Sequence, residues 1–225
     1  MDNKLTLLAF TILFGFSSGV IVTALDVSEA QAQTKRKKKS SQKAIGSVKA
    51  GLVGSGEATL SSNGSSTSLS DSNNFTLGGF ALFPVAPGIR VGPSLAYYPS
   101  IGFTSTTDSP SFSSPDGSEE AYGFDLNVMG EYTLPMSGFD GFGFLELGYS
   151  SVIPGAGGTI GDLSGYSIGG GAGAQFLMNR KMAVRGDLKV THYELEGSIP
   201  DEANSTPAKL SGNRVMLNIG VVFAL

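Results

Sequence analysis

The chain has 225 residues, with 32 glycines, no cysteine and no tryptophan, and charged residues make up only 15% of it. The absence of cysteine excludes a disulfide scaffold, thiolate zinc sites and cysteine nucleophiles. The net charge of −4 is unevenly distributed: seven of the 15 Lys and Arg lie between Lys35 and Lys49, whereas residues 50–225 carry 7 basic and 16 acidic side chains.

Residues 5–25 form the only long apolar run of the chain. The run follows Lys4 and precedes Ala30-Gln31-Ala32, which has the small-x-small form of a signal-peptidase site. We therefore expect a signal peptide over residues 1–32, with Val22-Thr23-Ala24 as a second candidate cleavage site. An uncleaved anchor helix is the alternative, because the run is long enough to span a bilayer.

Residues 33–43 (QTKRKKKSSQK) are basic and follow the export signal, so we expect a periplasmic tail and no nucleic-acid partner. Charge blocks of this kind are usually solvated linkers. The functional alternative is a contact with an anionic periplasmic polymer or with lipid headgroups.

Residues 213–225 alternate strictly between an apolar phase and a small, partly polar phase. The apolar phase comprises Val215, Leu217, Ile219, Val221, Phe223 and Leu225. Successive strand side chains point to opposite faces, and a soluble edge strand this apolar would be prone to aggregate. A strand of a closed membrane barrel needs this pattern. The segment resembles the final strand of bacterial outer-membrane proteins, which carries the signal for the barrel assembly machinery and usually ends in Phe or Trp; this chain ends in Leu225, two places after Phe223.

The remaining chain yields seven further alternating segments of about ten residues, the length of a membrane-spanning strand. All eight predicted strands are 44–54, 74–84, 88–98, 121–132, 141–151, 165–177, 182–194 and 213–225. Gly78-Gly79 blurs the phase of the second segment and suggests a bulge. Pro93 counts against the third, since proline removes a ladder donor.

The connections between these segments alternate long and short. Residues 55–73, 99–120, 152–164 and 195–212 are long and polar, whereas 85–87, 133–140 and 178–181 are short. Outer-membrane barrels have long extracellular loops and short periplasmic turns. The sequence therefore predicts an all-β fold, an eight-stranded antiparallel transmembrane β-barrel over residues 44–225, and resembles the OmpA/OmpX-type barrels there. Six or ten strands remain alternatives if the first or second segment is misassigned.

Aromatic residues gather at the predicted strand ends, as expected for side chains that settle at headgroup depth. The predicted girdles are formed by Tyr97, Tyr122, Tyr149 and Tyr166 at the outer end and by Phe83, Tyr132, Phe176 and Phe223 at the periplasmic end. Tyr98 and Phe142 also fall at such ends. Tyr193 lies in the inward phase and is expected in the lumen or at its rim.

Nine charged residues fall in the inward phase and form the predicted lumen network: Lys49, Arg90, Asp125, Glu131, Glu146, Arg185, Asp187, Lys189 and Arg214. The interior of an eight-stranded barrel is filled by side chains, and buried charges of mixed sign must pair. We interpret the set as a structural plug, with a narrow gated conduit as the alternative. Arg90 and Glu131 are expected to form an inward ion pair near the periplasmic end.

Some small outer-membrane barrels are lipid A deacylases that use a His and a Ser close together on one strand. The single histidine, His192, lies in the lipid-facing phase and is followed by Tyr193 and Glu194. No serine stands two residues on, so the partners that a general base needs are not specified. We expect an interfacial His192, no enzymatic activity, no cofactor and no metal centre.

The leading functional hypothesis is an integral protein of the bacterial outer membrane with a structural or surface-interaction role carried by long acidic extracellular loops. Expected partners are outer-membrane lipid and lipopolysaccharide, the barrel assembly machinery through residues 213–225, and divalent cations at the loops. The loops and their margins carry eleven acidic residues: Glu57, Asp71, Asp108, Asp116, Glu119, Glu120, Asp162, Glu194, Glu196, Asp201 and Glu202. The alternative is a narrow gated channel or small-molecule conduit; an outer-leaflet lipid-modifying enzyme ranks third.

Overall fold

The computed structural model describes residues 43–72, 74–105, 118–155, 161–200 and 205–225. The predicted signal peptide and residues 33–42 of the predicted basic tail lie outside the described residues. Among the residues that are described, no helix is long and apolar enough to cross a membrane.

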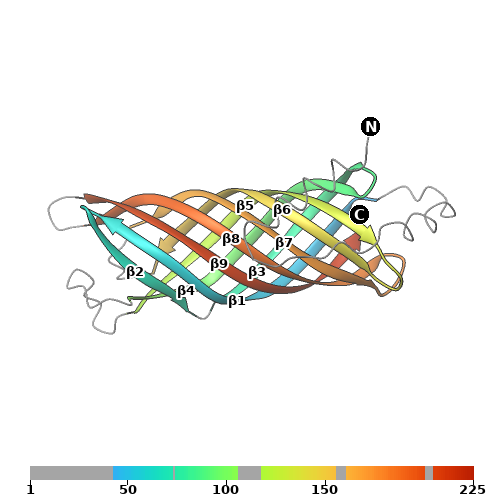
Figure 1. Cartoon of the computed structure of the whole chain (residues 1–225), viewed down its shortest axis with the longest axis horizontal. Helices are drawn as coiled ribbons and strands as arrows, with labels where there is room; N and C mark the ends of the chain where they lie inside the picture. The colour runs from blue at the N-terminus through green and yellow to red at the C-terminus, as the bar shows by residue number, and fades with distance from the viewer. Residues whose placement is uncertain (1–42, 73, 106–117, 156–160, 201–204) are drawn as a thin grey trace, which may run out of the picture. The chain divides into compact units, whose positions relative to one another are not determined.

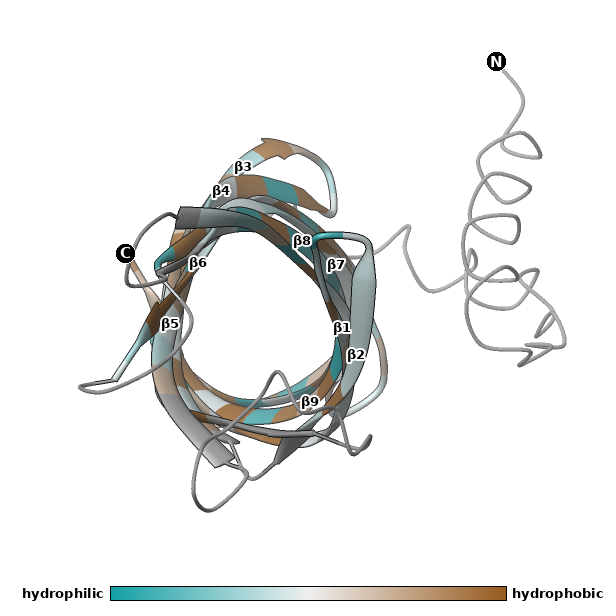
Figure 2. Cartoon of the chain, turned by 90° about the vertical axis from the view of Figure 1, so that its left-hand side faces the viewer, coloured by the Kyte–Doolittle hydropathy of each residue, from teal (hydrophilic) through white to brown (hydrophobic). Residues whose placement is uncertain are grey.

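Antiparallel strands form a closed ring (Figures 1 and 2). Their bounds are β1 Ile45–Ser62, β2 Ser65–Ser72, β3 Asn74–Ala86, β4 Ile89–Ser105, β5 Ser118–Pro135, β6 Asp140–Pro154, β7 Leu163–Leu177, β8 Met182–Pro200 and β9 Ser205–Ala224. The ring closes where β9 pairs with β1 along most of its length. Closure removes the exposed strand edges that an open sheet would leave.

The nine described strands occupy eight places in the ring, because β2 and β3 share one. β3 pairs with the first half of β1, from Ile45 to Val53, and β2 pairs with the second half, from Gly56 to Ser62. Both also pair with β4. The fold predicted from the sequence, an eight-stranded antiparallel barrel, is therefore confirmed, and the six- and ten-strand alternatives are wrong.

The strands are longer than predicted at one end of the barrel. The four segments predicted to be long loops, 55–73, 99–120, 152–164 and 195–212, instead contribute residues to the strands that flank them. β1 and β2 are joined by only Asn63 and Gly64, whose φ angles of 48° and 76° are both left-handed. Two such residues form the tight turn typical of a β-hairpin. The prediction of a long loop over 55–73 was wrong, because Asn63-Gly64 forms a tight turn that divides this serine-rich segment into two paired strands.

Two local predictions about backbone irregularity also differ from the structure. Gly78 and Gly79 pair in continuous register with both neighbouring strands, so the predicted bulge is absent there. The register shifts instead between Val53 and Gly56 of β1. Pro93 lies within β4, and the ladder to β3 is interrupted between the Phe80–Ser94 and Phe83–Val91 pairs. Proline has no N–H to donate to that ladder.

The middle of the barrel wall is apolar outside and polar inside. On β9, Leu217 and Ile219 face outward and are 63% and 64% exposed, whereas Asn218 between them is buried. A water-facing sheet would not present such a continuous apolar band, but lipid requires it. The end that carries the three short turns is the periplasmic end by the rule that outer-membrane barrels follow, and the opposite end is the outer end.

Candidate functional sites in the lumen and at the outer end

The structure places the nine predicted lumen charges inside the barrel. Lys49, Asp125, Glu131, Glu146, Arg185, Asp187, Lys189 and Arg214 are buried, and the Arg90 side chain is 12% exposed. They come from six strands, β1, β4, β5, β6, β8 and β9. Each points inward because every second residue of a strand faces the lumen. The charges lie between two apolar clusters of the lumen, one around Leu82, Met129 and Phe142 and one around Leu195 and Leu210.

The layer nearest the periplasmic end is organised by Glu131. Its carboxylate forms an ion pair with Arg185 and a second contact, of 3.3 Å, with Arg90 Nη1. The predicted pair of Arg90 and Glu131 is thus confirmed, but the sequence did not indicate that one carboxylate serves two guanidinium groups. Arg185 Nε also lies 3.5 Å from Asp187 Oδ2, and its guanidinium lies 3.4 Å from the centroid of the Phe142 ring.

The next layer joins β4, β6, β8 and β9. Lys189 forms an ion pair with Glu146, which also accepts a hydrogen bond of 3.1 Å from Ser94 Oγ. Asn218 Nδ2 donates to Asp187 Oδ1 at 2.7 Å. These contacts connect opposite sides of the ring through side chains alone. Removing one member would therefore leave a buried charge without its counter-ion.

The outermost polar layer is built around Asp125 and Arg214. Asp125 accepts hydrogen bonds from Tyr98 Oη at 2.5 Å and from Ser150 Oγ at 2.6 Å. The Arg214 guanidinium lies 4.8 Å from the Tyr98 ring centroid and 4.4 Å from that of Tyr193. Stacking of a guanidinium on two aromatic faces stabilises a cation in a water-poor interior.

The eight predicted girdle residues all face outward. Tyr97, Tyr122, Tyr149 and Tyr166 lie toward the outer end, and Phe83, Tyr132, Phe176 and Phe223 lie toward the periplasmic end, each at least a third exposed. Tyr98 and Phe142 are buried in the lumen instead, so the expectation that they join the aromatic residues at headgroup depth was wrong. Both fall in the inward phase of their strands, which could have been recognised from the sequence.

Beyond the outer girdle the alternation reverses its polarity. We call this part the outer extension: β2 together with residues 56–62 of β1, 192–200 of β8 and 205–213 of β9. On β8, Leu188 and Val190 face outward below it, whereas Glu194 and Glu196 take the same face within it. Leu195 between them is fully buried. A dry interior with a polar exterior is the pattern of a sheet in water, so the extension projects out of the membrane.

Charged side chains of β8 and β9 contact one another on the outside of the extension. Lys209 Nζ lies 2.7 Å from Glu194 Oε2 and 4.0 Å from Glu196 Oε1. The hydrogen bond from Lys209 lowers the pKa of the Glu194 carboxyl below its ordinary value, and the same contact raises the pKa of Lys209. His192 Nδ1 lies 3.0 Å from Asn213 Oδ1, and its Nε2 lies 3.7 Å from Glu194.

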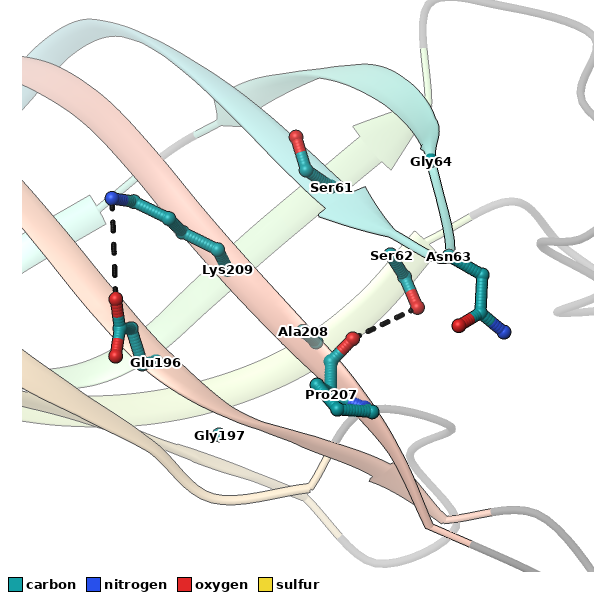
Figure 3. Close-up of a pocket in the computed structure, with 9 residues that line it drawn as sticks. All are labelled: Ser61, Ser62, Asn63, Gly64, Glu196, Gly197, Pro207, Ala208 and Lys209. Carbon is teal, nitrogen blue, oxygen red and sulfur yellow. Dashed lines mark hydrogen bonds and ion pairs between the residues drawn. The ribbon is translucent and has the colours of Figure 1, made fainter.

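The β1–β2 turn, β8 and β9 line an open groove of about 420 Å³ at the outer end (Figure 3). Its polar walls come from Ser61, Ser62, Asn63, Glu196, Pro207 and Lys209. Ser61 is paired with Lys209, and Lys209 with Glu196, so one row of side chains crosses three strands. Ser62 Oγ donates to the Pro207 carbonyl at 3.1 Å. Hydroxyl, carboxylate and ammonium groups in this arrangement can bind the hydroxyl groups of a sugar.

The structure describes some of the eleven predicted acidic loop residues and not others. Asp108, Asp116, Asp201 and Glu202 lie outside the described residues. Residues that the sequence assigned to loops but that lie on strands are Glu57, Asp71, Glu119, Glu120 and Glu196, so their assignment to loops was wrong. Glu194, predicted at a loop margin, lies within β8, and Asp162 lies between β6 and β7 as predicted. Within the described ranges, no three His, Asp or Glu side chains are grouped so that they could hold a metal ion.

No protein-family model and no curated protein sequence matches the chain. Solved structures do match its fold. The outer membrane protein OprG from Pseudomonas aeruginosa has 13% identity and a TM-score of 0.62, covering 81% of this chain and 96% of OprG. The outer membrane protein AlkL has 13% identity and a TM-score of 0.55 over 84% of this chain and 94% of its own. The outer membrane protease OmpT from Escherichia coli has 10% identity and a TM-score of 0.50, covering 85% of this chain and 100% of OmpT.

The likeness and the membrane-facing apolar band together define the class of protein. The chain has the fold of the small outer-membrane β-barrels of bacteria, the type to which the OmpA/OmpX-like barrels belong. At these identities the likeness concerns the fold alone, so the role of this barrel must be argued from its own residues.

Proposed function

We propose that the chain is a non-conducting, non-enzymatic barrel of the bacterial outer membrane that acts through contacts at the cell surface. The observation that carries this proposal is the reversed polarity of the outer extension. On β1, residues 56–62 extend the strand by about 20 Å, at about 3.3 Å per residue. This places a rigid polar surface above the lipid, where function on barrels is usually located.

The closed lumen supports the non-conducting part of the proposal. Lys189 and Glu146, together with the Glu131 layer, place paired side chains across the ring. In planar lipid bilayers we expect no steady single-channel current from the wild-type protein. The K189A/E146A variant, which removes a buried pair without leaving one charge behind, is expected to pass small currents. Steady wild-type current would overturn this part and favour a gated channel.

The surroundings of His192 support the non-enzymatic part. Its two ring nitrogens face Asn213 and Glu194, neither of which supplies the hydroxyl nucleophile of a serine hydrolase. One of the structural neighbours is a protease, and that activity is a property of that protein. Mass spectrometry should show the same, unmodified lipid A in cells that express the wild type and in cells that express the H192A variant. Deacylated lipid A with the wild type alone would contradict this.

The proposed surface partner is the saccharide part of lipopolysaccharide, bound at the groove of Figure 3. The groove is lined by hydroxyl, carboxylate and ammonium groups, which match sugar hydroxyls. Detergent-solubilised barrel should be retained on immobilised lipopolysaccharide, with magnesium or with a chelator present. We expect N63A/K209A to weaken retention at least fivefold, and the S137A control, which changes an exposed uncharged residue of the β5–β6 turn at the opposite end, to leave it unchanged. Equal retention of all three proteins would refute the site.

The chelator arm separates the direct contact from a bridge by divalent cations, which we expected from the sequence.

We further propose that β9, which presents a continuous apolar face to lipid, is the segment recognised by the barrel assembly machinery. Its outward residues Val215, Leu217 and Phe223 are exposed along the lipid face. Replacing Phe223 by Ser should slow membrane assembly in cells, followed by heat-modifiable migration, more than it changes unfolding in detergent.

A second candidate function is binding or passage of an apolar molecule. It is favoured by one observation, the apolar outer half of the lumen, where Ile101, Leu163, Leu195 and Leu210 are fully buried. Saturable binding of a radiolabelled twelve-carbon fatty acid to nanodisc-embedded barrel, lost in L210R, would favour this function. Binding no greater than that of empty nanodiscs would exclude it.

A further inference from the structure

The turn between β7 and β8 at the periplasmic end combines exposed apolar side chains with two cations. Leu177 and Met178 are 69% and 68% exposed, and Arg180 and Lys181 follow them after Asn179. Phe176 is also exposed, so strict alternation ends here and apolar side chains lie on both faces. Within the described part of the chain, no carboxylate forms an ion pair with either cation.

Hydrogen bonds hold the backbone of this turn in one conformation. Asn179 Oδ1 accepts from the backbone N–H groups of Lys181 at 2.8 Å and Met182 at 3.0 Å. The Met182 carbonyl accepts from the N–H groups of Met178 and Asn179 at 3.0 and 3.2 Å. The Ala224 N–H donates to the Lys181 carbonyl at 2.9 Å, which connects the turn to β9. The two cationic side chains therefore start from fixed backbone positions.

The neighbouring β5–β6 turn continues the apolar surface. Phe139 of that turn and Phe176 lie with ring centroids 5.6 Å apart, and Met136 is half exposed. The outer end differs, because there a polar extension separates the apolar band from the ends of the strands. At the periplasmic end the apolar band reaches the turns themselves. The β7–β8 turn is thus seated in the lipid interface, where aromatic and long cationic side chains meet the headgroups.

We propose that Arg180 and Lys181 bind the phosphate groups of anionic phospholipids in the periplasmic leaflet, with Leu177 and Met178 inserted beside the acyl chains. A guanidinium and an ammonium are the groups that bind phosphate in proteins. Asp140, the first residue of β6 beside the neighbouring turn, already accepts a hydrogen bond from Gln175 Nε2 at 3.2 Å. Each cation near an anionic surface strengthens association about fivefold, so the pair gives a preference of about 25-fold over a zwitterionic lipid.

The absence of cysteine makes a site-specific test direct. Full-length S137C, labelled with a fluorophore in the β5–β6 turn, is reconstituted in phosphatidylcholine vesicles containing increasing amounts of headgroup-nitroxide phosphatidylglycerol or phosphatidylcholine. We expect half-maximal quenching at a phosphatidylglycerol fraction 10- to 25-fold lower than the phosphatidylcholine fraction. In R180Q/K181Q the two lipids should quench alike. The preference should also shrink in 0.5 M salt, where charges are screened.

Two further variants serve as controls for the position of the label and for the apolar contact. The same label on N63C should show no preference for phosphatidylglycerol, because Asn63 lies in the β1–β2 turn at the tip of the outer extension, away from the lipid. L177S/M178S keeps both cations but removes the apolar contact, and is expected to reduce the preference. Heat-modifiable migration establishes that each variant is folded. Equal quenching by the two lipids in labelled wild type, or an undiminished preference in folded R180Q/K181Q, would overturn the proposal.

Discussion

Replacing Glu131 by Gln tests whether the lumen charges act as a buried network. Glu131 is the shared counter-ion of Arg185 and Arg90, and its side chain is fully buried. The variant keeps the size of the side chain but leaves two guanidinium groups with one carboxylate fewer. Breaking a buried ion pair by removing one partner costs about 3–5 kcal/mol. Arg185 keeps its contact with Asp187 and Arg90 keeps its hydrogen bond to Thr133, so we expect about 3 kcal/mol.

The measurement is reversible urea unfolding of the barrel in lipid vesicles, followed by tyrosine fluorescence and by heat-modifiable migration. A loss of about 3 kcal/mol corresponds to about a 100-fold change in the folding equilibrium. It should shift the urea midpoint to lower concentration by roughly 1 M for a slope near 3 kcal/mol per M. The slope itself should not change, because the surface exposed on unfolding is the same.

Glu196 provides a matched control on the outer extension. Its side chain is 78% exposed and lies 4.0 Å from Lys209, so E196Q should change the free energy of unfolding by less than about 0.5 kcal/mol. Adding R90M to E131Q removes one of the unpaired cations and should restore part of the loss. An E131Q loss as small as that of E196Q would refute the network, as would a double variant no more stable than E131Q.

Three further predictions concern the outermost polar layer of the lumen, the outer extension and the β1–β2 turn. Replacing Tyr98 by Phe removes the donor that lies 2.5 Å from Asp125 and should destabilise the barrel by about 1–3 kcal/mol in the same urea assay. In K209Q, the pKa of Glu194 should rise toward its ordinary value, because its main stabilising hydrogen bond is lost; carboxyl ¹³C titration of the two proteins compares them. The wild-type contact therefore favours folding above the ordinary Glu pKa, and this contribution falls as the pH drops through the lowered value. Replacing Gly64, at φ 76°, by Ala should cost about 1–2 kcal/mol and increase hydrogen exchange in the β1–β2 hairpin, where no steric clash complicates the result; unchanged exchange would contradict the turn assignment.

The sequence alone determined the kind of sheet and the face of each side chain in the membrane part. Period-two alternation depends only on strand geometry, so Leu217 and Asn218 could be assigned to opposite faces without knowing their neighbours. The same rule placed Arg90 and Glu131 on one face. Their similar depth followed from two short turns at the same end of the barrel, because Arg90 comes soon after residues 85–87 and Glu131 comes just before residues 133–140. Local periodicity and turn length were sufficient for these assignments.

The sequence prediction ended the strands too early at the outer end, because it assumed the pattern of lipid-facing strands along their whole length. In the outer extension, Leu195 and Leu210 point inward while Glu194 and Lys209 point outward. The alternation continues there with the opposite polarity, so the apolar outward positions end before the strands do. The reversal and the Asn63-Gly64 turn are both visible in the sequence, and together they could have predicted the extension.

Only the tertiary structure decided which charges pair and what surrounds them. Glu131 on β5 meets Arg185 on β8, two strands that are not adjacent in the ring, across the lumen. Arg214 likewise lies against Tyr98 of a distant strand. Such contacts depend on the curvature and stagger with which the ring closes, which set how far each side chain reaches across the interior. Alternation fixes the face of a residue, whereas closure of the barrel fixes its partner.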